Sequence, residues 1–146
     1  MSKLTNDGQT HPATATAPRF QSEAPFRPDL KIWMDGEFVA WQDASVHIMS
    51  HAMHYGSSVF EGIRCYKTKR GPAVFRLGDH VRRLFDSARI YRMKPSVDPA
   101  AFTAAILEAI RLNGFGACYI RPLVYRGLGQ PGVNPLHSPV CSAIVC

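Results

Sequence analysis

The chain has 146 residues, of which 46% are apolar and 19% charged, and it carries a formal charge of +6. This balance is typical of one soluble domain with a moderate core, and the chain is too short for a second. The basic residues are scattered over several segments, which argues against a nucleic-acid partner. Without a long apolar run or an apolar signal core, the sequence predicts a cytoplasmic protein that has no membrane partner.

The N-terminal segment, residues 1–29, is rich in Thr, Ala, Pro, Gln and Ser and lacks apolar periodicity, so we expect a disordered tail. The ordered domain is expected over residues 30–146. It begins with two apolar runs that flank Asp35-Gly36, a dipeptide that tolerates positive φ and favours a tight turn. We therefore predict a β-hairpin over residues 31–41.

A loop over residues 42–58 leads into a strand whose two faces differ. One face is expected to carry Phe60, Gly62, Arg64 and Tyr66, and the other Val59, Glu61, Ile63 and Cys65. The first face suits a ligand, because glycine permits close approach, the rings supply apolar walls and the guanidinium offers paired donors to an anion. A half-exposed strand with a solvated arginine explains the pattern equally well. A return strand over residues 73–76 completes a second hairpin.

Two amphipathic helices follow. In the first, apolar residues recur at helical spacing from Asp79 to Tyr91. The second begins with Asp98 as its N-cap and Pro99 in its first turn, and it ends at Asn113-Gly114.

Strand character returns over residues 117–125, where Tyr119 and Arg121 share one face and Ile120 lies on the other. A loop over residues 127–135 precedes a buried strand over residues 140–146. The chain stops inside this apolar run, whereas natural termini tend to trail off in polar residues. We therefore expect a truncated product or a fragment.

Histidines at 47, 51 and 54 have a spacing that would suit a metal site on a helix. We predict no metal site, because the segment is typical of a loop and offers no cysteine or carboxylate at ligand spacing. His80 and His137 are expected to be ordinary surface or capping residues. The four cysteines include no C-x-x-C pair, and we expect them to be reduced and structural.

Three ordered blocks resemble the branched-chain amino acid aminotransferases, which are pyridoxal phosphate enzymes of fold type IV. They are Tyr55-Gly-Ser-Ser-Val-Phe-Glu-Gly-Ile-Arg64, Phe75-Arg-Leu-Gly-Asp-His-Val-Arg-Arg-Leu-Phe-Asp-Ser-Ala88 and Cys118-Tyr-Ile-Arg-Pro-Leu123. The resemblance runs from about Ile32 to the last residue. It implies an α+β fold, a largely antiparallel sheet with two packed helices. This fold is the small N-terminal domain of such an enzyme, cut before the large cofactor-carrying domain.

The resemblance also implies a set of site residues. Arg83 would bind the cofactor phosphate, and Arg121 would meet the second carboxylate of glutamate or 2-oxoglutarate. Phe60, Tyr55 and Val133 would form apolar walls for a branched side chain, with Tyr55 and Val133 reaching across a dimer interface. The full implied substrate set is Tyr55, Phe60, Gly62, Arg64, Tyr119, Arg121 and Val133. Without the resemblance, solvation explains a helix-surface arginine such as Arg83 better than a binding site does, and it explains Arg121 on its strand face equally well.

The implied reaction moves an amino group between leucine, isoleucine or valine and 2-oxoglutarate with pyridoxal 5'-phosphate, in branched-chain amino acid biosynthesis, in a homo-oligomer when full length. The family's Schiff-base lysine and the acid partner of the cofactor ring lie beyond Cys146. No catalytic residue is therefore assigned, and the chain alone is expected to be inactive. Two alternatives stay open. One is another fold type IV enzyme, a D-amino acid aminotransferase or an aminodeoxychorismate lyase, and the other is a non-catalytic assembly partner.

Overall fold

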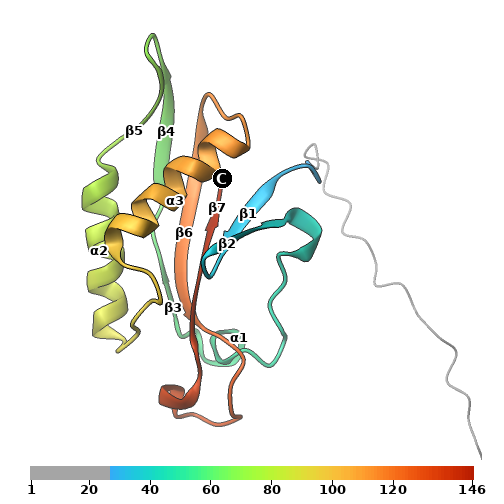
Figure 1. The fold of residues 1–146 in the computed structure, drawn as a ribbon. Helices are drawn as coiled ribbons and strands as arrows, with labels where there is room; N and C mark the ends of the chain where they lie inside the picture. The colour runs from blue at the N-terminus through green and yellow to red at the C-terminus, as the bar shows by residue number, and fades with distance from the viewer. Residues whose placement is uncertain (1–26) are drawn as a thin grey trace, which may run out of the picture.

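The computed structural model describes residues 27–146, which form one seven-stranded sheet with two long helices packed against it (Figure 1). The strand order is β2-β1-β7-β6-β4-β5, with β3 also pairing with β6, and all pairs are antiparallel. The predicted α+β class, with its antiparallel sheet and two helices, is confirmed. The prediction of a disordered tail concerns residues that lie almost entirely outside the described part of the chain.

The elements follow one another along the chain with short connections. The strands are β1 (Lys31–Met34), β2 (Glu37–Ala40), β3 (Ser58–Phe60), β4 (Ile63–Thr68), β5 (Gly71–Val74), β6 (Cys118–Arg126) and β7 (Val140–Val145). The helices are α1 (His51–Tyr55), α2 (Leu77–Ile90) and α3 (Pro99–Leu112), and 3-10 turns occur at Trp41–Asp43 and Pro135–His137.

Local sequence signals account for the first hairpin and the second long helix. Asp35 and Gly36 have φ values of 48° and 115°, which is the left-handed geometry that their turn requires. At the start of α3, the Asp98 carboxylate accepts a hydrogen bond of 2.7 Å from the Ala101 N–H, and Pro99 occupies the first turn. Both predictions are confirmed.

The predicted loop over residues 42–58 is corrected, because it contains the short helix α1. The Ser50–Leu128 bridge and a 3.1 Å bond from the His51 N–H to the Gly127 carbonyl anchor this helix to the end of β6. Gly56, with a φ of 63°, ends it in a left-handed cap. Five residues are too few to show helical periodicity, so these tertiary anchors define the helix.

Three further boundaries differ from the prediction. The strand expected over residues 59–66 is interrupted at Glu61-Gly62, and its two parts, β3 and β4, pair with successive stretches of β6. The return strand begins at Gly71, because this glycine, with a φ of 105°, closes the turn early. Helix α2 begins at Leu77, because its N-cap residue Arg76 has the left-handed conformation and pairs with Asp79 in the first helical turn.

The core lies between the helices and one face of the sheet. Val81 and Leu84 of α2, and Phe102 and Ile106 of α3, pack with sheet residues that include Ile63, Ile120, Val124 and Ile144. The Phe102 ring meets Trp33 and Phe85 edge to face, with centroid separations of 5.4 Å and 5.7 Å. This residue therefore joins both helices to the sheet.

Phe102→Ala should lower the free energy of unfolding by about 3–5 kcal/mol, because it removes a fully buried ring that both neighbouring rings contact. Leu107→Ala on the same helix is the control, since Leu107 is half exposed and its loss should cost less than about 1 kcal/mol. Urea titration followed by circular dichroism measures both variants. Equal midpoints for the two would contradict this account of the core.

Candidate functional site

The sheet face that the two long helices leave uncovered carries the predicted substrate residues of β4 and β6. Arg64 and Tyr119 are direct cross-strand partners, and both are exposed. Phe60, at the end of β3, is 59% exposed. Alternation explains this arrangement, because Ile63, Cys65 and Ile120 point to the opposite face and are buried in the core. The predicted two-faced strand is confirmed.

Arg121 is the centre of this cluster. Its guanidinium carbon lies 4.3 Å from the centroid of the Phe60 ring and 5.2 Å from that of Tyr119. Its Nη2 atom donates a hydrogen bond of 2.8 Å to the Tyr119 hydroxyl. Two rings and one hydrogen bond hold the cation without an acidic partner among the described residues. An arginine fixed in this way on an open surface can bind an anionic group at low cost in side-chain entropy.

Gly62 lies directly beneath the Tyr119 side chain. A Cβ atom at this position would lie 2.5 Å from the Tyr119 hydroxyl oxygen. The space over this glycine is therefore taken by the Tyr119 side chain, and the absent side chain allows the hydroxyl to reach Arg121. The sequence predicted a close approach correctly, but the neighbouring strand makes it.

Tyr55 and Val133 belong to a second group, where α1 meets the loop between β6 and β7. His51 organises this group. The His51 ring is buried, and its centroid lies 4.4 Å from that of Tyr55. Its Nδ1 atom forms a hydrogen bond of 2.7 Å with the Ser57 hydroxyl, and its Nε2 atom lies 3.3 Å from the Val133 carbonyl oxygen. The Tyr55 and Val133 side chains themselves are 51% and 77% exposed. Sequence reasoning weighed His51 only as a metal ligand and missed this structural role.

Arg83 projects from α2 and meets Glu61, on the side of residues 60–62 opposite the open face. Its Nε and Nη2 atoms each donate to one Glu61 carboxylate oxygen at 2.5 Å. The Glu61 side chain is only 7% exposed, whereas that of Arg83 is 66% exposed. His80 Nδ1 approaches the same carboxylate at 2.9 Å. His80 was predicted to be an ordinary surface residue, and this contact corrects that prediction.

Neighbouring positive charge and burial shift the pKa of Glu61 in opposite directions. The hydrogen bonds from Arg83 lower the pKa of this carboxyl below its ordinary value, and His80 adds to the effect, while burial opposes it. The same pairing raises the pKa of Arg83. The side-chain geometry therefore describes an ionised pair. An acid at a core-facing strand position is the signal that could have predicted a cationic partner on α2.

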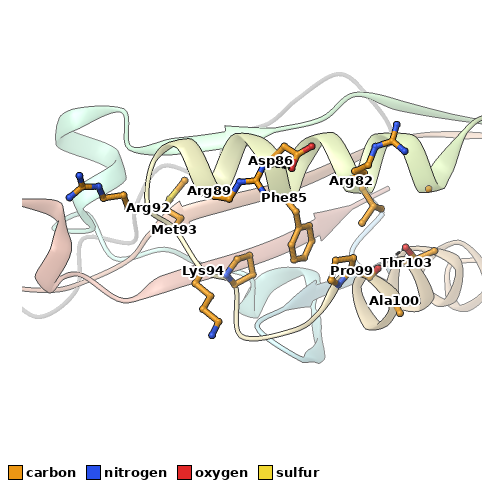
Figure 2. Close-up of a pocket in the computed structure, with 13 residues that line it drawn as sticks. Arg82, Phe85, Asp86, Arg89, Arg92, Met93, Lys94, Pro99, Ala100 and Thr103 are labelled. Atoms are coloured by element: carbon orange, nitrogen blue, oxygen red, sulfur yellow. Dashed lines mark hydrogen bonds and ion pairs between the residues drawn. The ribbon is translucent and has the colours of Figure 1, made fainter.

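A hollow of about 490 Å³ lies beside Arg83, and its other lining residues are Phe75, Arg76, Asp79, His80, Arg82 and Asp86. A larger one, of about 820 Å³, lies beside it between α2 and α3. Figure 2 shows Phe85 pointing from α2 into this second space, with Pro99 and Lys94 around it. None of the residues predicted to bind cofactor or substrate lines it. The larger hollow is therefore separate from the predicted cofactor and substrate residues.

An apolar groove of about 350 Å³ extends the open face of the sheet beyond Arg121. Trp41 and Val46 line it from the segment after β2, and Leu123 and Tyr125 line it from β6. It shares the Tyr119 and Arg121 face, since these β6 residues alternate with the buried Ile120 and Val124. The open face thus combines apolar surface with one fixed cation.

The remaining sequence predictions concern metals, thiols and membranes. Over residues 27–146, no group of three or more potential ligand side chains could hold a metal ion, and no helix is long and apolar enough to cross a membrane. All four cysteines are free, and burial raises the pKa of Cys118 to about 11 and of Cys146 to about 12. The thiols of Cys118 and Cys146 therefore stay protonated at neutral pH, as expected for structural residues.

The sequence of this chain is similar to those of known aminotransferases. The family profile of amino-transferase class IV matches residues 58–145. The branched-chain-amino-acid aminotransferase of Escherichia coli (strain K12) is 53% identical over 104 residues, which are 71% of this chain and 34% of that protein. The chain thus spans about a third of the length of this curated relative.

Solved structures show the same similarity in three dimensions. The T.th. branched-chain amino acid aminotransferase superimposes with a TM-score of 0.77 at 47% identity, over 80% of this chain and 39% of that one. It has been solved with pyridoxamine 5'-phosphate, with N-(5'-phosphopyridoxyl)-L-glutamate and with 4-methylvaleric acid. The E. coli structure has a TM-score of 0.76.

The ionised Glu61 should make stability depend on pH. Because its pKa in the folded chain lies below the ordinary value of about 4.3, its contribution is complete above that pH and is lost as pH falls through the folded pKa. Glu61→Gln should therefore be less stable than the parent at pH 7, with the difference shrinking towards pH 3. Denaturant titrations at several pH values measure this.

The matched control is Glu108→Gln, which breaks a Glu–Arg pair of the same geometry with Arg111 on the exposed side of α3. Its difference from the parent should be small at every pH, because that carboxylate is hydrated. A Glu61→Gln difference that stays constant from pH 7 to pH 3 would refute the assignment.

Proposed function

This chain belongs to the class IV amino-transferases, and from that premise we propose that it is the small domain of a branched-chain amino acid aminotransferase. Such an enzyme transfers the amino group between leucine, isoleucine or valine and 2-oxoglutarate. The observation that carries the proposal is the cluster of Phe60, Tyr119 and Arg121 on the open face of the sheet.

One pocket must accept an aliphatic side chain and a carboxylate in turn. The ring of Phe60 offers apolar contact to a branched side chain, while Arg121 offers paired donors to the distal carboxylate of glutamate. Because the cation is already held against two rings, the aliphatic substrate meets the face of an aromatic ring and no strongly hydrated charge. The solved T.th. structures, with a phosphopyridoxyl-glutamate and with 4-methylvaleric acid, support this pairing of ligands.

The residues present fit the phosphate of pyridoxal 5'-phosphate. Glu61 uses two of the five N–H donors of the Arg83 guanidinium, and the side chain remains two-thirds exposed. Arg83 would hold the phosphate, while Arg76 and Arg82, which line the same hollow, are both paired with Asp79. When bound, the cofactor supplies the electron sink that lets the amino group move between substrates.

The lysine that attaches the cofactor is assigned to the two thirds of the relatives' length that this chain does not match. The lysines among residues 27–146 are all exposed, so none lies in the buried setting that an activated Schiff-base lysine needs. They are Lys31, Lys67, Lys69 and Lys94. The contribution of this chain is thus to bind and orient the substrate and to hold the phosphate.

Tyr55 and Val133 are proposed to complete the pocket of a second subunit in a homo-oligomer. Their side chains are exposed, while His51 fixes their positions from within the fold. A rigid base with an exposed apolar tip suits a contact across an interface.

A hybrid enzyme tests the function. In it, residues 30–146 of this chain replace the segment of the E. coli enzyme that they match. We expect the hybrid to transaminate leucine with 2-oxoglutarate, while the 146-residue chain alone shows no turnover, because it lacks an activated lysine. The measurement is glutamate formation in a coupled assay. A hybrid that binds cofactor and turns over D-alanine but not leucine would overturn the substrate assignment.

Arg121→Ala in the hybrid should separate the two substrate types. The Michaelis constants for glutamate and 2-oxoglutarate should rise about tenfold or more, because a substrate carboxylate loses a charged partner. The constant for leucine should change by less than about threefold, since leucine presents no second charge. Arg70→Ala, at an exposed turn, is the control and should change neither. Equal losses for both substrate types would remove Arg121 from this role.

A further inference from the structure

Glu61 is an acidic residue at a core-facing position of the sheet. It falls between β3 and β4, where its backbone N–H donates to the Pro122 carbonyl at 3.0 Å, and the whole residue is only 6% exposed. Its neighbours in sequence, Phe60 and Gly62, face the opposite side, where the Tyr119 and Arg121 cluster lies. A buried carboxylate is costly unless it is fully paired, so its retention at this point calls for a specific role.

Glu61 pairs with one edge of the Arg83 guanidinium and not with the whole group. Glu61 takes Nε and the adjacent Nη2, which form the lateral edge of the guanidinium. Glu61 leaves both hydrogens of Nη1 and the second hydrogen of Nη2, and Nη2 also lies 3.4 Å from His80 Nδ1. One hydrogen of Nη1 and the second hydrogen of Nη2 form the terminal fork. Because the carboxylate is buried and the arginine side chain is exposed, Glu61 anchors one edge of the group from inside the fold. The terminal fork is left for an anion outside it.

His80 strengthens this anchor from the same helix. Its Nδ1 lies 2.9 Å from the Glu61 Oε2 that also receives Arg83 Nη2. The carboxylate therefore has partners one turn apart on α2, and it cannot rotate without losing one of them.

We propose that Glu61 is a positioning residue, which presets the guanidinium of Arg83 for the cofactor phosphate. Phe60, Glu61 and Gly62 are consecutive and alternate between the two sides of the sheet, so one short segment contributes to both the Arg83 site and the open face. This inference rests on the proposed function, because it takes pyridoxal phosphate as the anion that Arg83 binds. Glu61 acts through Arg83 and does not touch the phosphate.

Two contributions of Glu61 to phosphate affinity oppose each other. Its negative charge repels a phosphate, whereas its hold on Arg83 removes the freedom that this long side chain would lose on binding. The positioning effect dominates, because one guanidinium carries both contacts, and its pairing with Glu61 keeps the terminal fork of Nη1 and Nη2 in place for the anion. Loss of the carboxylate should therefore weaken cofactor binding, although the site becomes more positive.

The test is a double-mutant cycle in the hybrid enzyme, with Glu61→Gln, Arg83→Ala and the double variant. Equilibrium affinity of the apo form for pyridoxal phosphate, followed by absorbance, is the readout, and it does not depend on turnover. We expect Glu61→Gln to raise the dissociation constant about tenfold and Arg83→Ala to raise it more. In the Arg83→Ala background, Glu61→Gln should add less than about twofold, because the group that it positions is gone.

Glu108→Gln is the matched control, since it breaks a Glu–Arg pair of the same geometry away from the site and should leave the affinity unchanged. Thermal midpoints check that each variant is folded at the assay temperature. If Glu61→Gln is not folded at that temperature, Glu61→Asp is used in its place. Glu61→Asp keeps the negative charge but moves the carboxylate away from Arg83, so it should also weaken cofactor binding.

Unchanged or tighter cofactor affinity in a folded Glu61 variant overturns the inference, and so do fully additive losses in the cycle. These outcomes are separate from failure of the proposed function. A hybrid that binds pyridoxal phosphate but does not act on branched-chain substrates refutes the function and still measures Glu61. A folded hybrid that binds no pyridoxal phosphate refutes both.

Discussion

The short segment Phe60-Glu61-Gly62 is the constraint on which the site depends. It interrupts what would be one strand, and it keeps the alternation of side chains across the interruption because both flanking strands pair with β6. Glu61 is thereby directed to the helix side and its two neighbours to the open side. A one-residue shift in the pairing of this segment would exchange the side chains of the two faces. It would bury the Phe60 ring against α2 and expose Glu61.

The two faces of the sheet divide the physical tasks. On one face, Phe102 and the other core residues of α2 and α3 supply the hydrophobic burial that stabilises the domain. The other face keeps Phe60, Tyr119 and an apolar groove exposed, which costs stability and is explained by a surface that meets something else. Because the helices pack on only one face, the exposed side chains of the other face lie outside the core.

Arg83 and Arg121 illustrate two ways to fix a cation. Arg83 is held by a buried carboxylate, so charge pairing sets its position. Arg121 lies against two rings, and among residues 27–146 the phenol of Tyr119 is its one hydrogen-bond partner, so no acid within that part of the chain compensates its charge. The difference fits the two anions proposed for them. A cofactor phosphate stays bound through the catalytic cycle, whereas a substrate carboxylate must enter and leave, and it must be replaceable by an aliphatic side chain.

The sequence by itself determined the elements whose signals are local. The Asp35-Gly36 turn, the Asp98 cap and the two-faced strand around Phe60 each follow from residue type or from a period of two, and they are observed as predicted. The motif resemblance supplied the family and the proposed site residues, which no local signal identifies. Only the tertiary structure decided the rest. Helix α1, the role of His51 and the Glu61–Arg83 pair depend on contacts between segments distant in sequence, and neither a five-residue helix nor a single buried acid carries a periodic pattern that could reveal its partner.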